Sequence, residues 1–376
     1  MAGIYFHIPF CKQACHYCNF YFSTNRRQQQ SLVTALIKEL ETQKNFFENG
    51  TVVQTIYFGG GTPSLLTIDE VHQIMEAIKK YFVVLPQAEI SFECNPDDIS
   101  FEQCTAWLRA GVNRLSIGIQ SFVDAHLQLM NRAHNSKQAL QSVENAVAAG
   151  FKNISIDLMY ALPNLSDAEW KQNILTACSL PINHISCYNL TIEEKTALAK
   201  FIATGKCAAI DDEQAARQFQ ILLDITGANG FEQYEISNFA RQQQYSAHNT
   251  AYWQSKPYLG IGPSAHSFKN NKRYANIAHT AQYVQAIAEG NLRQEIETLT
   301  PAMQYNEWVL TRLRTCWGVD VALLETQFGY EKAQCFKLQM STAIMLGRVK
   351  LYNNCYTLTA LGKLWADDVA QSAFIV

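Results

Sequence analysis

Short apolar runs alternate with longer, helix-compatible segments along the first half of the chain. The runs cover residues 4–7, 55–58, 89–93, 114–120, 153–160 and 184–189, and Gly, Pro or Asn residues bound them. Runs this dense in apolar residues are typical of buried parallel strands rather than of half-exposed antiparallel ones. Four of the runs are followed by a helix-start signal, a Ser or Thr answered three residues later by Glu or Gln: Thr67/Glu70, Ser100/Gln103, Ser166/Glu169 and Thr191/Glu194.

Six strand–loop–helix units within roughly 200 residues predict an α/β fold, a partial TIM-type (β/α)6 barrel. A doubly wound open sheet is the alternative. In a barrel, the loops at the carboxyl ends of the strands build the site, so polar residues at those ends converge. Glu93, Gln120 and Asp157 occupy such positions.

The pattern changes after residue 200. A helical stretch over residues 211–226 precedes a Gln-rich segment and the Gly-rich residues 259–267. Thr300-Pro301 is a good N-cap and first-turn pair for a helix, and two short runs around Asn353-Asn354 predict a hairpin. We expect a barrel core over residues 1–200, a barrel extension and connecting segment over 201–298, and a smaller, winged-helix-like C-terminal domain over 299–376.

Composition and charge exclude several functional classes. The chain has 376 residues, 48% hydrophobic and 17% charged, with a net charge of -3. Residues 300–376 hold seven Lys and Arg against six Asp and Glu, so the winged-helix-like part has no basic stripe for nucleic acid. No apolar run approaches the roughly 20 residues that cross a bilayer, and the N-terminus lacks the basic start of a signal peptide. We expect a cytoplasmic protein.

Three of the eleven cysteines form a cluster. The odd total cannot pair completely into disulfides, which favours a reducing compartment. Cys11, Cys15 and Cys18 give the spacing C-x3-C-x2-C, which chance would produce about 0.01 times in such a chain. Soft thiolate ligands favour zinc or an iron–sulfur cluster.

The number of ligands separates those two possibilities. Three thiolates on a four-iron cluster leave one iron open for a small molecule, whereas structural zinc takes four protein ligands. His7 or His16 is a possible fourth ligand, so a zinc loop is the structural alternative. The glycines at positions 59–61, before Thr62-Pro63, allow close approach of the backbone to a polar ligand, although alone they also fit a tight turn.

The cysteine loop and the Gly-Gly-Gly-Thr-Pro segment together resemble the radical S-adenosylmethionine (SAM) superfamily. The segment Tyr-Phe-His-Ile-Pro-Phe-Cys at residues 5–11 is similar to the branch that contains oxygen-independent coproporphyrinogen III dehydrogenase, and further matches run to about residue 270. The resemblance implies that Cys11, Cys15 and Cys18 hold a [4Fe-4S] cluster whose free iron chelates SAM. It also implies a barrel that excludes water around the cofactor.

Motif by motif, the resemblance assigns two sets of residues. The positions around the cluster-bound SAM are Tyr5, Tyr17, Gly60 and Glu93. The positions that match a second SAM are Gly61, Thr62, Gln120, Arg132, Asp157 and Thr191. His266 is a further candidate close to the SAM site. Arg132 as a surface ion-pair residue and Thr191 as a helix N-cap are the structural alternatives.

Two further sequence features distinguish between branches of the superfamily. Phe20 stands where coproporphyrinogen dehydrogenases carry an additional cysteine. His-Asn-Thr-Ala-Tyr-Trp at residues 248–253 resembles the H-N-x-x-Y-W motif of HemW-type heme chaperones, which bind heme and pass it to acceptor proteins. The resemblance therefore implies a heme chaperone, with the porphyrinogen dehydrogenase as the alternative, and it leaves catalysis undecided.

His248 is the candidate ligand of the heme iron, because imidazole is a good axial ligand. Its structural alternative is a role in organising the domain boundary. The heme acceptor is not identifiable from the sequence, and a homodimer is compatible with it.

Overall fold

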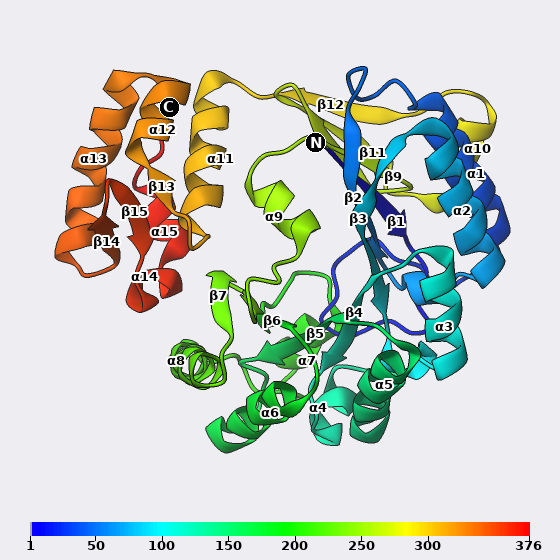
Figure 1. Cartoon of the computed structure of the whole chain (residues 1–376). Helices are drawn as coiled ribbons and strands as arrows, with labels where there is room; N and C mark the ends of the chain where they lie inside the picture. Colours follow the sequence, from blue (N-terminus) through cyan, green and yellow to red (C-terminus); the bar gives the residue numbers. More distant parts are fainter. Residues whose placement is uncertain (1) are drawn as a thin grey trace.

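The six predicted strands form the parallel centre of one large sheet in the computed structural model, which describes residues 2–376 (Figure 1). They lie side by side in chain order: β1 (Ala2–Ile8), β2 (Val52–Gly60), β3 (Val83–Cys94), β4 (Arg114–Gln120), β5 (Asn153–Tyr160) and β6 (His184–Asn189). In a doubly wound sheet the strand order reverses at a switch point. The unbroken order excludes that alternative and confirms the partial barrel.

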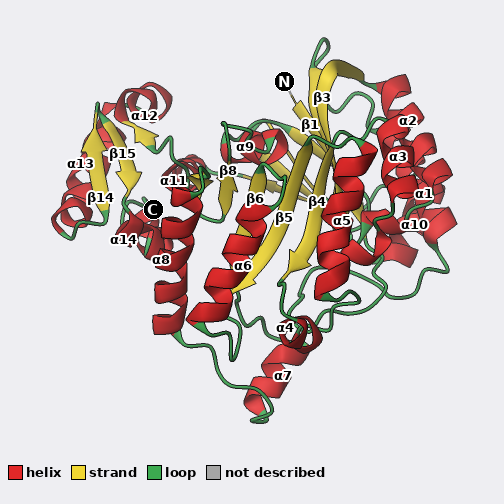
Figure 2. Cartoon of the chain, turned by 60° about the horizontal axis from the view of Figure 1, so that its bottom comes forward, coloured by secondary structure: helices red, strands yellow, loops and turns green. Residues whose placement is uncertain are grey.

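Helices connect these strands and cover the outer face of the sheet (Figure 2): α1 (Gln29–Thr42), α2 (Ile68–Tyr81), α3 (Phe101–Ala110), α4 (Asp124–Leu129), α5 (Ser136–Ala149) and α6 (Asp167–Ser179). The predicted caps Thr67, Ser100 and Ser166 each accept a backbone N–H three residues on. The helix start at Thr191 is wrong, because α7 (Ala197–Ala203) begins later, with Thr196 as its cap. The turn before it passes through Lys195 at φ 69°.

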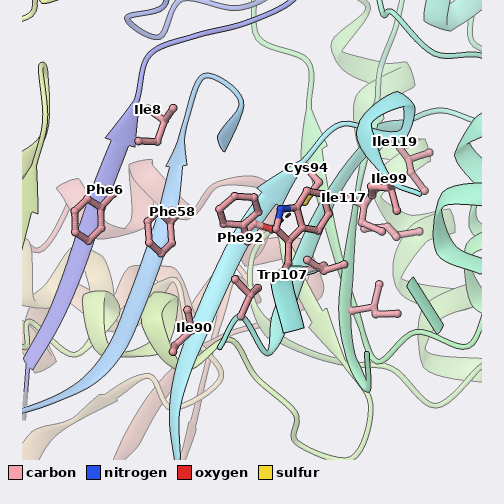
Figure 3. Close-up of a cluster of buried hydrophobic side chains, with 14 of the residues drawn as sticks. Phe6, Ile8, Phe58, Ile90, Phe92, Cys94, Ile99, Trp107, Ile117 and Ile119 are labelled. Carbon is pink, nitrogen blue, oxygen red and sulfur yellow. Dashed lines mark hydrogen bonds between the residues drawn. The ribbon is translucent and has the colours of Figure 1, made fainter. Parts of the chain in front are cut away.

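An aromatic row holds the outer face of the strands to the helices (Figure 3). The ring centroids of Phe6 and Phe58 lie 4.9 Å apart, those of Phe58 and Phe92 5.5 Å, and those of Phe92 and Trp107 5.3 Å. All four side chains are fully buried, and each stabilises the fold by about 1.5–3 kcal/mol. Because side chains alternate along a strand, the neighbours of these residues, such as Glu93, face the barrel interior.

The sheet extends beyond the six parallel strands at both edges. Next to β1 lie β9 (Tyr258–Ile261), β10 (His266–Lys269), β11 (Lys272–Asn276) and β12 (Gln294–Thr298). Next to β6 lie β8 (Asn238–Ala240) and β7 (Glu232–Glu235). The helices of this region are α8 (Asp212–Ala228), α9 (Ala247–Trp253) and α10 (Thr280–Ala288). This part therefore adds strands to the barrel sheet.

Residues from Tyr305 onward build a second hydrophobic core around Trp308 and Phe336. Its elements are α11 (Pro301–Leu313), β13 (Val319–Asp320), α12 (Val321–Phe328), α13 (Tyr330–Met345), β14 (Val349–Tyr352), β15 (Cys355–Leu358), α14 (Ala360–Leu364) and α15 (Ala366–Gln371). Asn353 and Asn354 form the predicted hairpin turn at φ 46° and 62°. A three-stranded sheet with packed helices is the expected winged-helix-like arrangement, set beside the barrel in Figure 1.

Candidate functional site

The three clustered cysteines open onto one cavity of about 470 Å³ at the carboxyl ends of the parallel strands. They lie on the loop that follows β1, and the end of β2 lies beside them. Thr62 Oγ1 donates a hydrogen bond to the Cys11 sulfur at 3.6 Å, and Arg132 Nη1 donates one to the Cys15 sulfur at 3.3 Å. The polar residues at the ends of β3, β4 and β5 line the same cavity.

The turn after α4 holds the cysteine loop in place. Asn131 Nδ2 donates to the carbonyl of Ala14 at 2.7 Å, and its own carbonyl accepts from Gln13 Nε2 at 2.8 Å. The backbone N–H of His16 donates to the Met130 carbonyl at 3.1 Å. Asn131 adopts φ 57°, a left-handed conformation that asparagine tolerates better than most residues. Hydrogen bonds within the protein therefore fix the conformation of the cysteine loop.

The three glycines after β2 pack directly under this loop. A Cβ atom at Gly60 would lie 2.7 Å from His7 Nδ1, and one at Gly61 would lie 2.7 Å from the Phe10 carbonyl oxygen. Gly60 also has φ 108°, which an L side chain rarely adopts. The glycines are thus required by the close contact between β2 and the cysteine loop.

Three carboxylates, those of Glu93, Asp157 and Glu193, and one guanidinium, that of Arg132, line the cavity. Burial raises the pKa of Glu93 to about 7, although the hydroxyl of Tyr57 donates to it at 2.8 Å. Burial likewise raises the pKa of Asp157 to about 6. Arg132 donates to Asn95 Oδ1 and to the Gly118 carbonyl, each at 2.6 Å. The cavity suits a ligand that carries both a cationic and an anionic group.

The chemistry of the donor set fits a cluster better than a single zinc ion. Among residues 2–376, no three His, Cys, Asp or Glu side chains stand close enough together to hold one metal ion. His7 Nε2 bonds to the Tyr21 carbonyl at 2.9 Å, and the His16 ring packs edge-on against Phe201 instead of lining the cavity. Three thiols spread around one cavity suit a polynuclear cluster with an open iron.

Most of the residues assigned from the motifs line this cavity: Cys11, Cys15, Tyr17, Cys18, Gly60, Gly61, Thr62, Glu93, Gln120, Arg132, Asp157 and Thr191. Gln120 adopts φ 68°, a conformation that costs about 1–3 kcal/mol and is common at functional sites. The motif reading did not single out Asn95, Ser116 and Tyr188, which also line the cavity. Asn95 directly follows β3 and Tyr188 is next to the last residue of β6, so the position at a strand end identifies these two, whereas Ser116 lies within β4.

Three assigned residues lie elsewhere. Tyr5 stands behind the cavity wall, with its ring stacked on Tyr57 at 6.1 Å between centroids. His266 lines a second, open hollow at the β10–β11 edge of the sheet. His248 points into the barrel interior, where its Nδ1 lies 2.9 Å from Thr55 Oγ1.

The segment around His248 fills the amino-terminal part of the barrel. Glu89 accepts the backbone N–H groups of Ala247 and His248, each at 3.0 Å. Burial, together with the smaller effect of the nearby Arg114 charge, lowers the pKa of His248 to about 4. The Arg314 guanidinium, from the C-terminal part of the chain, lies 5.7 Å from the Trp253 ring centroid. The motif therefore connects the barrel interior with the C-terminal core.

Comparisons with known proteins agree with this geometry. A sequence model of the radical SAM superfamily matches residues 5–177, and a model of the HemN C-terminal domain matches residues 299–365. The heme chaperone HemW of Bacillus subtilis is 34% identical over 376 residues, covering 98% of each chain. The heme chaperone HemW of Mycobacterium tuberculosis is 31% identical, covering 98% of this chain and 94% of that protein.

This chain belongs to the HemW family. The family lies in the radical SAM superfamily, which implies a [4Fe-4S] cluster and SAM, and the predicted family is confirmed. The structure of coproporphyrinogen III oxidase (HemN) from Escherichia coli superposes with a TM-score of 0.86 and 23% identity, covering 99% of this chain and 90% of that one. That likeness supports the HemW-family fold, a radical SAM barrel with a C-terminal domain.

Proposed function

We propose that this protein binds heme and transfers it to acceptor proteins. The observation that carries the proposal is the similarity, over nearly the whole of both chains, to a relative named as a heme chaperone. We place this activity in the cytoplasm, because the eleven cysteines of the described chain are all free, as in a reducing compartment. No helix within residues 2–376 is long and apolar enough to cross a membrane.

We further propose that Cys11, Cys15 and Cys18 hold the cluster and that SAM occupies the cavity beside it. Burial raises the pKa of the Cys11 thiol to about 11, so the thiolate needs metal to form at neutral pH. Glu93 and Asp157 supply negative charge for the ammonium and sulfonium groups of SAM, and Arg132 supplies positive charge. When bound to a reduced cluster, SAM can supply a 5'-deoxyadenosyl radical.

The assigned set that matches a second SAM stays part of this proposal. Gly61, Thr62 and Gln120 belong to it, and all three line the cavity. These residues support the second candidate function, oxidative decarboxylation of a porphyrinogen. Phe20 argues against it, because this apolar side chain, 71% exposed at the cavity, replaces a cysteine of the dehydrogenases and can neither donate nor accept a proton.

One experiment separates the two functions. The full chain is reconstituted with iron and sulfide without oxygen and titrated with hemin, with an unrelated soluble protein in parallel. We expect saturable uptake of about one heme per chain. A second sample receives reductant, SAM and coproporphyrinogen. Uptake no greater than that of the control protein overturns the chaperone proposal, and decarboxylated product establishes the enzymatic one. Size-exclusion chromatography of the loaded sample tests whether a homodimer forms.

A further inference from the structure

Two of the three clustered sulfurs accept a hydrogen bond from a side chain, and one asparagine connects the two donors. Asn95 Nδ2 donates to Thr62 Oγ1 at 3.3 Å, and the Thr62 hydroxyl donates to the Cys11 sulfur. Asn95 Oδ1 accepts from Arg132 Nη2 at 2.6 Å, and Arg132 Nη1 donates to the Cys15 sulfur. A single amide at the end of β3 therefore contacts the donors of two different sulfurs.

The chemistry of these groups determines the direction of each hydrogen bond. Arginine has only donors, so the amide oxygen of Asn95 must face Arg132 and the amide nitrogen must face Thr62. The Thr62 oxygen then accepts this N–H, and its own proton is left for the Cys11 sulfur. A carboxylate or an apolar group in place of the amide could not impose this order, because neither can donate to Thr62.

The backbone that carries Asn95 is itself held in place. Asn95 directly follows β3 and precedes Pro96, the first residue of a short 3-10 turn. Its backbone N–H donates to Ser64 Oγ at 3.4 Å, and the Ser64 hydroxyl donates to Asp98 at 2.7 Å. The Thr62 side chain is buried. The amide and the hydroxyl are therefore held toward each other by their own segments.

Arg132 brings a positive charge to the same edge of the cavity. Its guanidinium also donates to the Gly118 carbonyl at 2.6 Å. Its Nε is buried and has no partner within residues 2–376, so this N–H is available to an anionic group of a ligand in the cavity. A reduced iron–sulfur cluster carries one more negative charge than the oxidised one. A nearby cation and an O–H donor stabilise that charge, and such contacts at the sulfurs tune the reduction potential.

We propose that Asn95 is a positioning residue that aims Thr62 and Arg132 at the sulfurs of Cys11 and Cys15 and thereby raises the reduction potential of the cluster. The inference rests on the proposed [4Fe-4S] cluster at these cysteines. Each donor at a coordinating sulfur favours the reduced state, so the cluster accepts an electron more readily. Thr62 then acts on the cluster in addition to the role in SAM binding that the family resemblance implies.

The test is the midpoint potential of the reconstituted full chain without SAM, measured by redox titration followed by electron paramagnetic resonance. We expect Asn95→Ala to lower it. At the wild-type midpoint the ratio of reduced to oxidised cluster should fall from one to about one tenth, which is about 59 mV for one electron. Asn189→Ala is the matched control, because Asn189 is an exposed asparagine of the same cavity, and it should keep the wild-type potential. Iron and sulfide content and melting temperature show whether cluster and fold survive.

A double-mutant cycle shows whether Asn95 acts through Thr62. Thr62→Val keeps the shape of the side chain and removes the hydroxyl, so it should also lower the potential, whereas Thr62→Ser should restore most of it. Combining Asn95→Ala with Thr62→Val should shift the potential by less than the sum of the two single shifts, because both changes remove the same donor from the Cys11 sulfur. Fully additive shifts would contradict this route.

The remaining outcomes separate this inference from the proposed cluster. An unchanged potential in Asn95→Ala with its cluster intact overturns the inference. If the alanine variant takes up no cluster, Asn95→Leu decides, because it fills the space of the amide without a donor or an acceptor. Its potential should fall, and an unchanged potential overturns the inference as well. A wild-type chain that binds neither iron nor sulfide instead overturns the proposed cluster, and the inference with it.

Discussion

Polar residues lie at both ends of the barrel interior, and the two ends differ in whether these residues face a cavity. At the amino-terminal end several polar groups have partners within the protein: His184 bonds to Ser155 at 2.7 Å and to Tyr234 at 2.8 Å, and Glu89 accepts two backbone N–H groups of α9. At the carboxyl end, Glu93 and Asp157 face a cavity. The comparison teaches that polar groups with internal partners stabilise the barrel, whereas those facing the cavity remain available for a ligand.

The largest effect is expected at the carboxyl end. Replacing Cys11, Cys15 and Cys18 together by serine should abolish bound iron and sulfide after anaerobic reconstitution, because a serine hydroxyl is a poor ligand for a soft cluster. Metal analysis measures this, and Cys335→Ser, at an exposed position far along the chain, is the control. A triple variant that keeps its iron would contradict the cluster assignment. Melting temperature should change little in both.

The next effect is expected at the amino-terminal end. Glu89→Ala removes the carboxylate that lies 3.9 Å from buried Arg114 and that accepts the first N–H groups of α9. The free energy of unfolding should fall by about 3–5 kcal/mol, because Arg114 is left buried and unpaired. Denaturant titration measures the loss. Glu76→Ala, on an exposed part of α2, should change stability little. Equal losses of unfolding free energy in the two variants would mean that the Glu89–Arg114 pair stabilises the fold no more than an exposed ion pair does.

A smaller effect is expected from the turn that holds the cysteine loop. Asn131→Gly keeps the left-handed backbone accessible and removes only the hydrogen bond to Ala14, so it should cost about 1 kcal/mol. The visible sign is faster loss of cluster absorbance in the presence of a chelator. Asn25→Gly, on the exposed segment after the cysteines, serves as the control. Equal rates of absorbance loss in both variants would show that Asn131 does not position the cysteine loop.

The smallest effect is a dependence on pH in the cofactor-free protein. The pKa of Glu93 is raised to about 7 and that of Asp157 to about 6, so the folded state holds protons that the unfolded state releases. The stability that these two carboxyl groups contribute is therefore present at acid pH and is lost as pH rises from about 4 through 7, whereas buried histidines with a lowered pKa, such as His248, contribute with the opposite sign. The measurement is therefore the difference in melting temperature between the wild type and Glu93→Gln across this range, and we expect the wild type to lose stability relative to the variant as pH rises. A difference that stays constant with pH would assign the dependence to other groups.

Much of the barrel was predictable from local pattern. The strands over residues 114–120, 153–160 and 184–189 have the predicted bounds, because apolar density and flanking Gly, Pro and Asn act within a few residues. The first three strands are longer than predicted, since sheet pairing extends a strand beyond its apolar run. Thr191 misled because its spacing to Glu194 fits a capping pair, whereas the chain there forms the cavity wall.

The sequence predicted those residues of the candidate site whose motif has a single structural explanation. The cysteine spacing, the glycines and the strand-end carboxylates all identify residues of the cavity. Asn131 was not predictable, because its partners Gln13 and Ala14 lie more than a hundred positions away in the sequence. The directions of His248 and His266 were equally hidden, since a motif names a residue type without saying which way the side chain points.

The sequence by itself determined the family, the alternation of strands and helices, and the three thiols, because each depends on residue type and spacing along the chain. Only the tertiary structure decided which polar groups have partners and which face a cavity. That difference arises from contacts between distant segments, such as α9 against β2 and β3, whose closeness no local pattern records.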